Sequence, residues 1–170
     1  ELLLRRSGIA LGGQTPPRIL ATALGTVAVA TADPLAAAAL QVAAGLLMEG
    51  GEEPSFPAQK EALLAYAIAL ESWPDCMTAA RGARRMALRL GEMPTFVKAA
   101  TALGGLETDP AARCERLLEA ADGHHVGPEE AAAAFELRCQ ALTEDPSSAR
   151  AADAVITAVG QGRDAGRAVE

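Results

Sequence analysis

Helix-breaking residues recur along this sequence with one shared period. A series of prolines is spaced 40, 36 and 36 residues apart, at Pro34, Pro74, Pro110 and Pro146. A series of glycines is spaced 40, 36 and 35 residues apart, at Gly51, Gly91, Gly127 and Gly162. Two independent series with nearly the same period indicate that one structural unit is repeated along the chain.

The stretches between these residues favour helix. Alanine, leucine, arginine and glutamate dominate them, and β-branched and aromatic residues are too scattered to form strands. Asp33, Asp109 and Asp145 each precede a proline, which predicts an N-cap carboxylate followed by proline at the first helical position. Each unit is therefore predicted to be a helical hairpin. First helices are expected at 1–11, 35–50, 76–90, 111–122 and 147–160. Second helices are expected at 57–72, 95–107 and 128–143, with another one ending near Thr31. A turn-like segment is expected over 161–164.

A helical period of this length is typical of a solenoid, in which each hairpin buries its apolar face only against its neighbours. We therefore expect an all-α protein, an α-solenoid of antiparallel hairpins at 1–33, 34–73, 74–109, 110–145 and, incomplete, 146–170. A compact helical bundle is the alternative, and the coincidence of the two series disfavours it. The chain begins with Glu1 rather than Met, so we interpret it as a single repeat domain from a longer protein.

The residues of one unit resemble a tetratricopeptide repeat (TPR), a pair of antiparallel helices with small residues at the packing positions. The matching residues are Leu40, Ala44, Leu47, Gly51, Ala62, Tyr66, Ala69 and Pro74. The next two units match at Leu90, Gly91, Gly105 and Pro110, and at Gly127, Ala134, Ala141 and Pro146. The repeats are degenerate, because alanine occupies most of the usual aromatic positions. The resemblance covers nearly the whole chain, about four and a half repeats. It implies a right-handed superhelix whose first helices line a concave groove that binds peptides or proteins, without catalysis.

Arginines at intervals of four residues form a stripe on one predicted first helix, at Arg81, Arg85 and Arg89. The resemblance places these side chains in the groove, where they would bind an acidic group, because a guanidinium pairs bidentately with a carboxylate. The alternative is a solvated face paired loosely with neighbouring glutamates. Further groove-facing candidates on the same reasoning are Gln41, Glu49, Arg150 and Asp153.

Motifs for catalysis or metal binding are not found in the sequence. It contains no phosphate-binding loop, no zinc-protease helix and no nucleophile elbow. The only two histidines, His124 and His125, follow a glycine in a predicted loop, and their spacing to Cys114 and Cys139 matches no known ligand pattern. We therefore expect neither an enzyme nor a metal or cofactor site. Phe56, Phe96 and Phe135 are predicted to be core residues.

The composition limits the classes of partner that the chain could bind and the compartment in which it could act. The chain has 22 acidic and 15 basic residues, a net charge of −7, which argues against nucleic-acid binding. The uncharged runs at 19–32 and 34–48 are too short to insert into a membrane. The apolar run after Arg18 resembles a signal peptide, but it fits the repeat and starts too far from residue 1. Three widely spaced cysteines predict reduced thiols, and we expect a cytoplasmic protein. The alanine-rich, lysine-poor composition favours a bacterial source.

The predicted function is that of a non-catalytic scaffold that binds a peptide or protein segment in a concave groove. Two alternatives stay open. Solenoid ends could stack end to end through Val155 and Ile156, which would make the chain a self-assembly module. The chain could also be a regulatory or sensor module of a larger multidomain protein.

Overall fold

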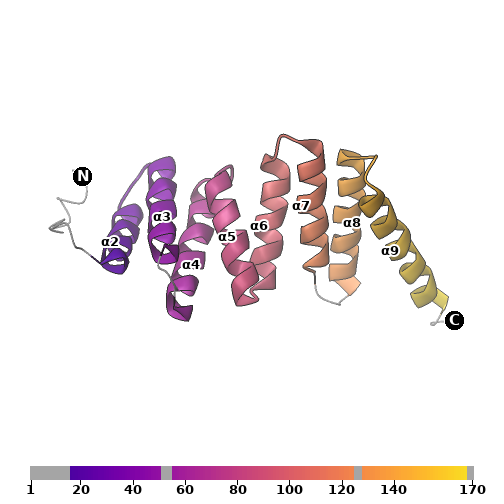
Figure 1. Ribbon diagram of the computed structural model, residues 1–170, viewed down its shortest axis with the longest axis horizontal. Helices are drawn as coiled ribbons and strands as arrows, with labels where there is room; N and C mark the ends of the chain where they lie inside the picture. The colour runs from indigo at the N-terminus through magenta and orange to yellow at the C-terminus, as the bar shows by residue number, and fades with distance from the viewer. Residues whose placement is uncertain (1–15, 51–54, 125–127, 168–170) are drawn as a thin grey trace. The chain divides into compact units, whose positions relative to one another are not determined.

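The computed structural model describes residues 16–50, 55–124 and 128–167, and these residues form eight α-helices and no strand (Figure 1). The helices are α2 (Pro17–Val29), α3 (Pro34–Glu49), α4 (Phe56–Ser72), α5 (Met77–Leu90), α6 (Met93–Leu106), α7 (Pro110–Asp122), α8 (Pro128–Glu144) and α9 (Ala149–Arg167). The predicted all-α class is confirmed, and consecutive helices pack against their neighbours as in an α-solenoid of hairpins. The helix predicted over 1–11 lies outside the described residues.

The C-terminal helix is longer than predicted. α9 continues through Gly160 and Gly162 to Arg167, so the turn expected at 161–164 is wrong. An added Cβ at either glycine would meet nothing within 4 Å, and neither glycine has the positive φ of a helix terminator. An exposed glycine lowers helix stability by about 1 kcal/mol relative to alanine, which weakens a helix without ending it. Of the four periodic glycines, Gly91 ends its helix in the left-handed conformation, with φ 71°, and Gly51 and Gly127 lie outside the described residues.

The periodic prolines begin helices in only two of the four places. Asp33 accepts a hydrogen bond from the Leu35 amide at 3.1 Å, and the aspartate at 109 caps α7 in the same way, so those two N-caps are confirmed. At Asp145 the prediction is wrong, because its carboxylate accepts from the Ser147 amide at 3.0 Å within a turn and α9 starts later, at Ala149. Pro74 likewise lies in a turn that precedes α5.

By its internal contacts the chain divides into two compact units, Glu1–Thr95 and Phe96–Glu170, with the division inside the first turn of α6. In the first unit, α2 packs on α3, α3 on α4 and α4 on α5, and α3 also touches α5. Alanine fills this core because its small side chain lets helix axes approach closely. Fully buried alanines occur on α3, α4 and α5, at Ala38, Ala62, Ala69, Ala79, Ala80, Ala83 and Ala87.

In the second unit, α7 packs on α8 and α8 on α9. A cluster of buried residues joins these three helices, made of Cys114, Leu117, Leu118, Ala141 and Ala151. Phe96 is buried as predicted, but Phe56 and Phe135 are exposed, so their assignment to the core is wrong. None of the described helices is both long and apolar enough to span a bilayer.

Candidate functional site

Two first helices of the first unit present contrasting exposed faces. On α3 the residues at the solvent side share one helical stripe and are apolar: Leu35, Ala39, Val42 and Leu46. On α5 the corresponding stripe carries the predicted arginines together with one leucine: Arg81, Arg85, Leu88 and Arg89. Because α3 and α5 are in contact, these eight residues are treated together as the α3/α5 face.

A charged cluster joins the two helices beside this face. Glu49, in the last turn of α3, receives two hydrogen bonds from the Arg85 guanidinium of α5, one of them from Nη2 to Oε2 at 2.6 Å. The hydroxyl of Tyr66, on α4, donates a third hydrogen bond to Oε2 of the same carboxylate at 2.9 Å. The Glu49 side chain is 13% exposed and that of Arg85 41%. The carboxylate is thus a partly buried junction between three helices.

This geometry sets the charge states of the cluster. Hydrogen bonding from Arg85 lowers the pKa of the Glu49 carboxyl below its ordinary value, against the opposing effect of burial. Burial raises the pKa of the Tyr66 hydroxyl, and its hydrogen bond to Glu49 raises that pKa further. The hydrogen bonds to Glu49 also raise the pKa of Arg85. At neutral pH the cluster therefore holds an ionised carboxylate, a cationic guanidinium and a neutral phenol.

Two glycines make room for the tyrosine. Tyr66 is fully buried, and its ring lies between Gly45 of α3 and Gly82 of α5. An added Cβ would lie 2.7 Å from a ring atom at Gly45 and 2.6 Å from one at Gly82, both closer than side-chain atoms pack. The sequence prediction did not assign a role to Tyr66. The available signal was a glycine in the interior of each neighbouring helix, because such a glycine often marks a close approach.

The structure brings Glu49 and Arg85 together and keeps Arg81 and Arg89 on the same face of α5, but it places the other predicted binding residues elsewhere. Arg81 and Arg89 are exposed on α5, and the positive charge of Arg89 contributes to the lowered pKa of Glu49. Arg150, in the second unit, pairs with Glu115 and with Asp122, the latter at 3.1 Å. Asp153 is exposed on α9. Arg85 and Arg150 each link one first helix to the next, so both arginines already have carboxylate partners.

Gln41, which was predicted to face the groove, does not lie on the exposed face of α3. Its side chain is turned to the opposite side of the helix and is 5% exposed. There it lines space bounded by residues of α2 and α4, and no residue of α5 lines that space. Its position follows from the helical repeat, because Gln41 shares a stripe with the buried residues Ala38 and Ala44 rather than with Leu46.

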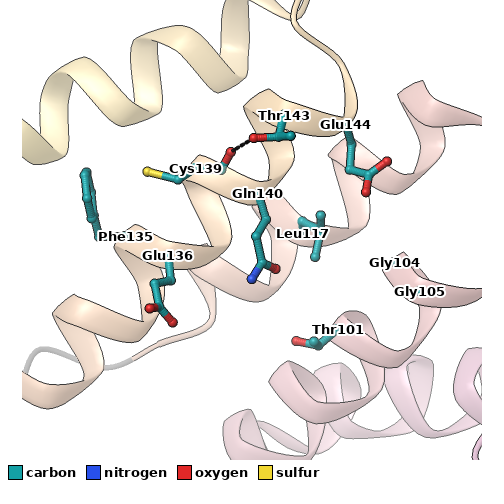
Figure 2. Close-up of a pocket in the computed structure, with 10 residues that line it drawn as sticks. All are labelled: Thr101, Gly104, Gly105, Leu117, Phe135, Glu136, Cys139, Gln140, Thr143 and Glu144. Carbon is teal, nitrogen blue, oxygen red and sulfur yellow. Dashed lines mark hydrogen bonds between the residues drawn. The ribbon is translucent and has the colours of Figure 1, made fainter.

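A hollow of about 590 Å³ lies between α6 and α8 in the second unit, over Leu117 of α7 (Figure 2). Figure 2 shows Glu136, Cys139 and Gln140 along α8, with Thr101 across from them on α6. The Thr143 hydroxyl donates to the Cys139 carbonyl at 2.9 Å, within its own helix.

The predicted loop histidines lie at the end of α7. His124 follows the helix and is half-buried, whereas His125 lies outside the described residues. Cys114 is buried in the core, and all three cysteines carry free thiols. Within 16–50, 55–124 and 128–167, no three histidine, cysteine or acidic side chains are grouped closely enough to hold a metal ion.

Comparison with known proteins returned no relatives. No family model matches the chain, and the searches of curated proteins and of solved structures each found no match.

Proposed function

We propose that this chain is a non-catalytic, TPR-like interaction module that binds a peptide or protein segment on the α3/α5 face. The observation that carries the proposal is the pairing of an apolar stripe on α3 with a cationic stripe on α5. Leu46 is 49% exposed and Leu88 54% exposed on neighbouring helices. Leaving such apolar side chains in water is unfavourable, and covering a leucine is worth about 1.5–3 kcal/mol.

The charges favour an acidic ligand. Arg89 is exposed, and no carboxylate within the part of the chain that the structure describes forms an ion pair with it. Arg85 is already held by Glu49, so it acts as a fixed positive neighbour rather than as the primary contact. A segment with leucine-like side chains against Leu46 and Leu88, and an aspartate or glutamate opposite Arg89, complements this face.

The preorganised helices support binding without folding. α3 and α5 are tied by Glu49 and Arg85, so the protein side of the interface loses little conformational entropy when a segment binds. A bacterial setting fits the lysine-poor composition, in which lysine occurs only at Lys60 and Lys98, and a cytoplasmic one fits three widely spaced cysteines.

The test is selection of short random peptides displayed on a cell surface against the whole chain. We expect enrichment of peptides that combine acidic and leucine-like residues. Affinity for these peptides should fall by about tenfold or more with Arg89→Glu and with Leu46→Asp. Lys98→Glu, a matched charge reversal at an exposed position of α6, should leave affinity unchanged. Peptides that bind all three variants as well as the unaltered chain would contradict the proposal.

Self-assembly is a second candidate, favoured by a separate observation. Ile156 on α9 is 69% exposed, and Val159, one turn further, is also exposed. Association through this helix would bury both side chains. Sedimentation velocity should then show concentration-dependent oligomers that Ile156→Asp abolishes. Sedimentation as a monomer at all concentrations would remove this candidate. A role as a regulatory module of a larger protein is compatible with either kind of binding.

A further inference from the structure

Gln41 is the one polar residue among the described positions that is classed as buried. Its carboxamide has two donor hydrogens and an acceptor oxygen, yet it forms no hydrogen bond with any residue in 16–50, 55–124 or 128–167. Its nitrogen and oxygen are not among the fully buried side-chain atoms that lack a hydrogen-bond partner, so the carboxamide opens to the space between α2 and α4. The Gln41 carboxamide is therefore a polar group in this space that a ligand can contact by replacing water.

Two cavities meet at Gln41. One has a volume of about 400 Å³ and the other about 470 Å³, and Gln41 and Ile68 line both of them. α2 and α4 form the walls, and α3 forms the floor. The carboxamide oxygen lies 4.0 Å from where a Cβ on Gly25 would stand, so it is directed towards α2 across the space between the helices. These cavities together are named the Gln41 groove.

The lining defines the chemistry of an occupant. Around Gln41 the groove is apolar, with Ala44, Met48 and Ala65 on one side of it and Ile68 in the middle. The charged groups at one end, Arg18 and Glu61, pair with each other at 2.7 Å, and Thr31, Glu71 and Ser72 make the other end polar. An occupant needs apolar side chains along its length and one polar group at the centre that both donates and accepts a hydrogen bond.

The length of the groove sets how many residues an occupant can have, and the Gln41 carboxamide favours one backbone conformation. Its lining on α4 runs from Glu61 to Ser72, which at 1.5 Å per residue is about 17 Å. An extended chain of about five residues spans that length. The backbone groups of a helix are already paired internally, whereas an extended chain presents free N–H and C=O groups at its sides. Only the extended form offers a peptide group to Gln41.

We propose that the Gln41 groove binds an extended peptide segment whose alternate apolar side chains enter the two cavities and whose central peptide group pairs with the Gln41 carboxamide. This site lies on the opposite side of α3 from the α3/α5 face, so it does not depend on the function proposed above. The partner is a chain that offers an unpaired extended strand, and the apolar alternation is its recognition feature.

The experiment is a titration of the whole chain, labelled with ¹⁵N, with an acetylated and amidated peptide of alternating valine and serine residues. Valine side chains fill the cavities and serines face solvent, because successive side chains of an extended chain point to opposite faces. The Gln41 side-chain amide signals, identified by their loss in Gln41→Leu, should shift on binding. Affinity should fall by about tenfold or more in Gln41→Leu. Gln140→Leu, which changes an exposed glutamine at the hollow of the second unit, should bind normally.

A second measurement keeps the test valid if Gln41→Leu does not fold. Peptides N-methylated at one position each lack a single N–H donor, and they are tested on the unaltered chain. Methylation at the central position should weaken binding, and methylation at the ends should not. The proposal is overturned if the Gln41 signals do not shift, if central N-methylation has no effect, or if folded Gln41→Leu binds equally well. It is also overturned if sedimentation shows a dimer of the chain that the peptide dissociates, because a second copy of the chain then occupies the groove.

Discussion

The Tyr66 hydroxyl donates a 2.9 Å hydrogen bond to the Glu49 carboxylate, which places a fully buried phenol against a partly buried anion. Arg85 holds the same carboxylate from the other side. One side chain from each of three successive helices therefore converges on a single point. In a row of helices where each contacts chiefly its neighbours, this contact fixes α3 relative to α5 as well as to α4.

The packing of Tyr66 between two glycines predicts that Gly82→Ala is destabilising. The new methyl group would lie 2.6 Å from the ring, and overpacking of this kind costs about 1–3 kcal/mol. Chemical unfolding followed by circular dichroism measures the change. Gly25→Ala, also inside a helix of the first unit, is the matched control, since its methyl group would meet its nearest neighbour at an ordinary 4.0 Å. The free energy of unfolding of the control should stay unchanged or rise by up to about 1 kcal/mol. Equal losses of stability in both variants would refute the packing argument.

The lowered pKa of Glu49 predicts a stability difference that depends on pH. Because the folded state holds the carboxyl more acidic than the unfolded state does, its contribution is present above the ordinary glutamate pKa of about 4.3. That contribution is lost as the pH falls through the lower, folded-state pKa. At neutral pH, Glu49→Gln should reduce the free energy of unfolding by about 1–2 kcal/mol, the lower part of the range for charged hydrogen bonds because Arg85 is partly exposed.

Urea unfolding of both proteins across the acid range measures this difference. The difference in the free energy of unfolding between Glu49→Gln and the unaltered chain should disappear at acid pH, where the Glu49 carboxyl is protonated in both the folded and the unfolded state. Glu92→Gln alters an exposed glutamate of the same unit and should show no gap at any pH. A gap for Glu49→Gln that stays constant with pH would show that the charge of Glu49 is not the source.

The two aspartates that flank Pro34 and Pro74 should respond differently to replacement. Asp33 caps α3 through the Leu35 amide, so Asp33→Ala should cost about 1 kcal/mol. Asp75→Ala should change stability by less than about 0.5 kcal/mol, because Cys76 rather than Asp75 is the N-cap of α5. Thermal unfolding of the two variants side by side tests this, and similar losses would mean that the turn at Pro74 is also a cap.

Gly91 ends α5 with φ 71°, which predicts the order in which replacements at this position destabilise the protein. Gly91→Ala should be destabilised by about 1–2 kcal/mol, since a Cβ is strained in the left-handed region. Gly91→Asn should lose less stability, because asparagine adopts the left-handed conformation more readily than alanine does. No atom lies within 4 Å of a Cβ built there, so the loss reports backbone strain and not crowding. Melting temperatures in the reverse order would show that the helix end rearranges.

The helices themselves were largely predictable, because their signals are local. The Asp-Pro pairs at 33–34 and 109–110 start helices where expected, and the predicted ranges agree with α4 and α7 to within one residue. Prediction failed where a local signal has two outcomes. Pro146 starts a turn rather than a helix, and the glycines of α9 do not end it, because proline and glycine are compatible with either structure. Pro74 also lies in a turn, but the helix predicted from Cys76 agrees with α5 to within one residue.

The candidate site was only partly predictable. The arginine stripe on α5 follows from a spacing of four residues, but the partner of Arg85 comes from a residue 36 positions away. The direction of Gln41 depended on which side of α3 its neighbours cover. A helical pattern shows that a residue shares a stripe with others, but it does not show which stripe meets a neighbouring helix when alanine occurs on every side of the helix, as it does on α3.

The sequence by itself determined the all-α class, the repeat and most helix boundaries, because breakers, caps and helix propensity act over a few neighbouring residues. Only the tertiary structure decided that Glu49, Tyr66 and Arg85 converge, that two glycines enclose the tyrosine ring, and that Gln41 faces α2 and α4 without a hydrogen-bond partner among the described residues. Those relationships depend on the distance and rotation between helices. Packing of small side chains sets both quantities, and no single helix contains that information.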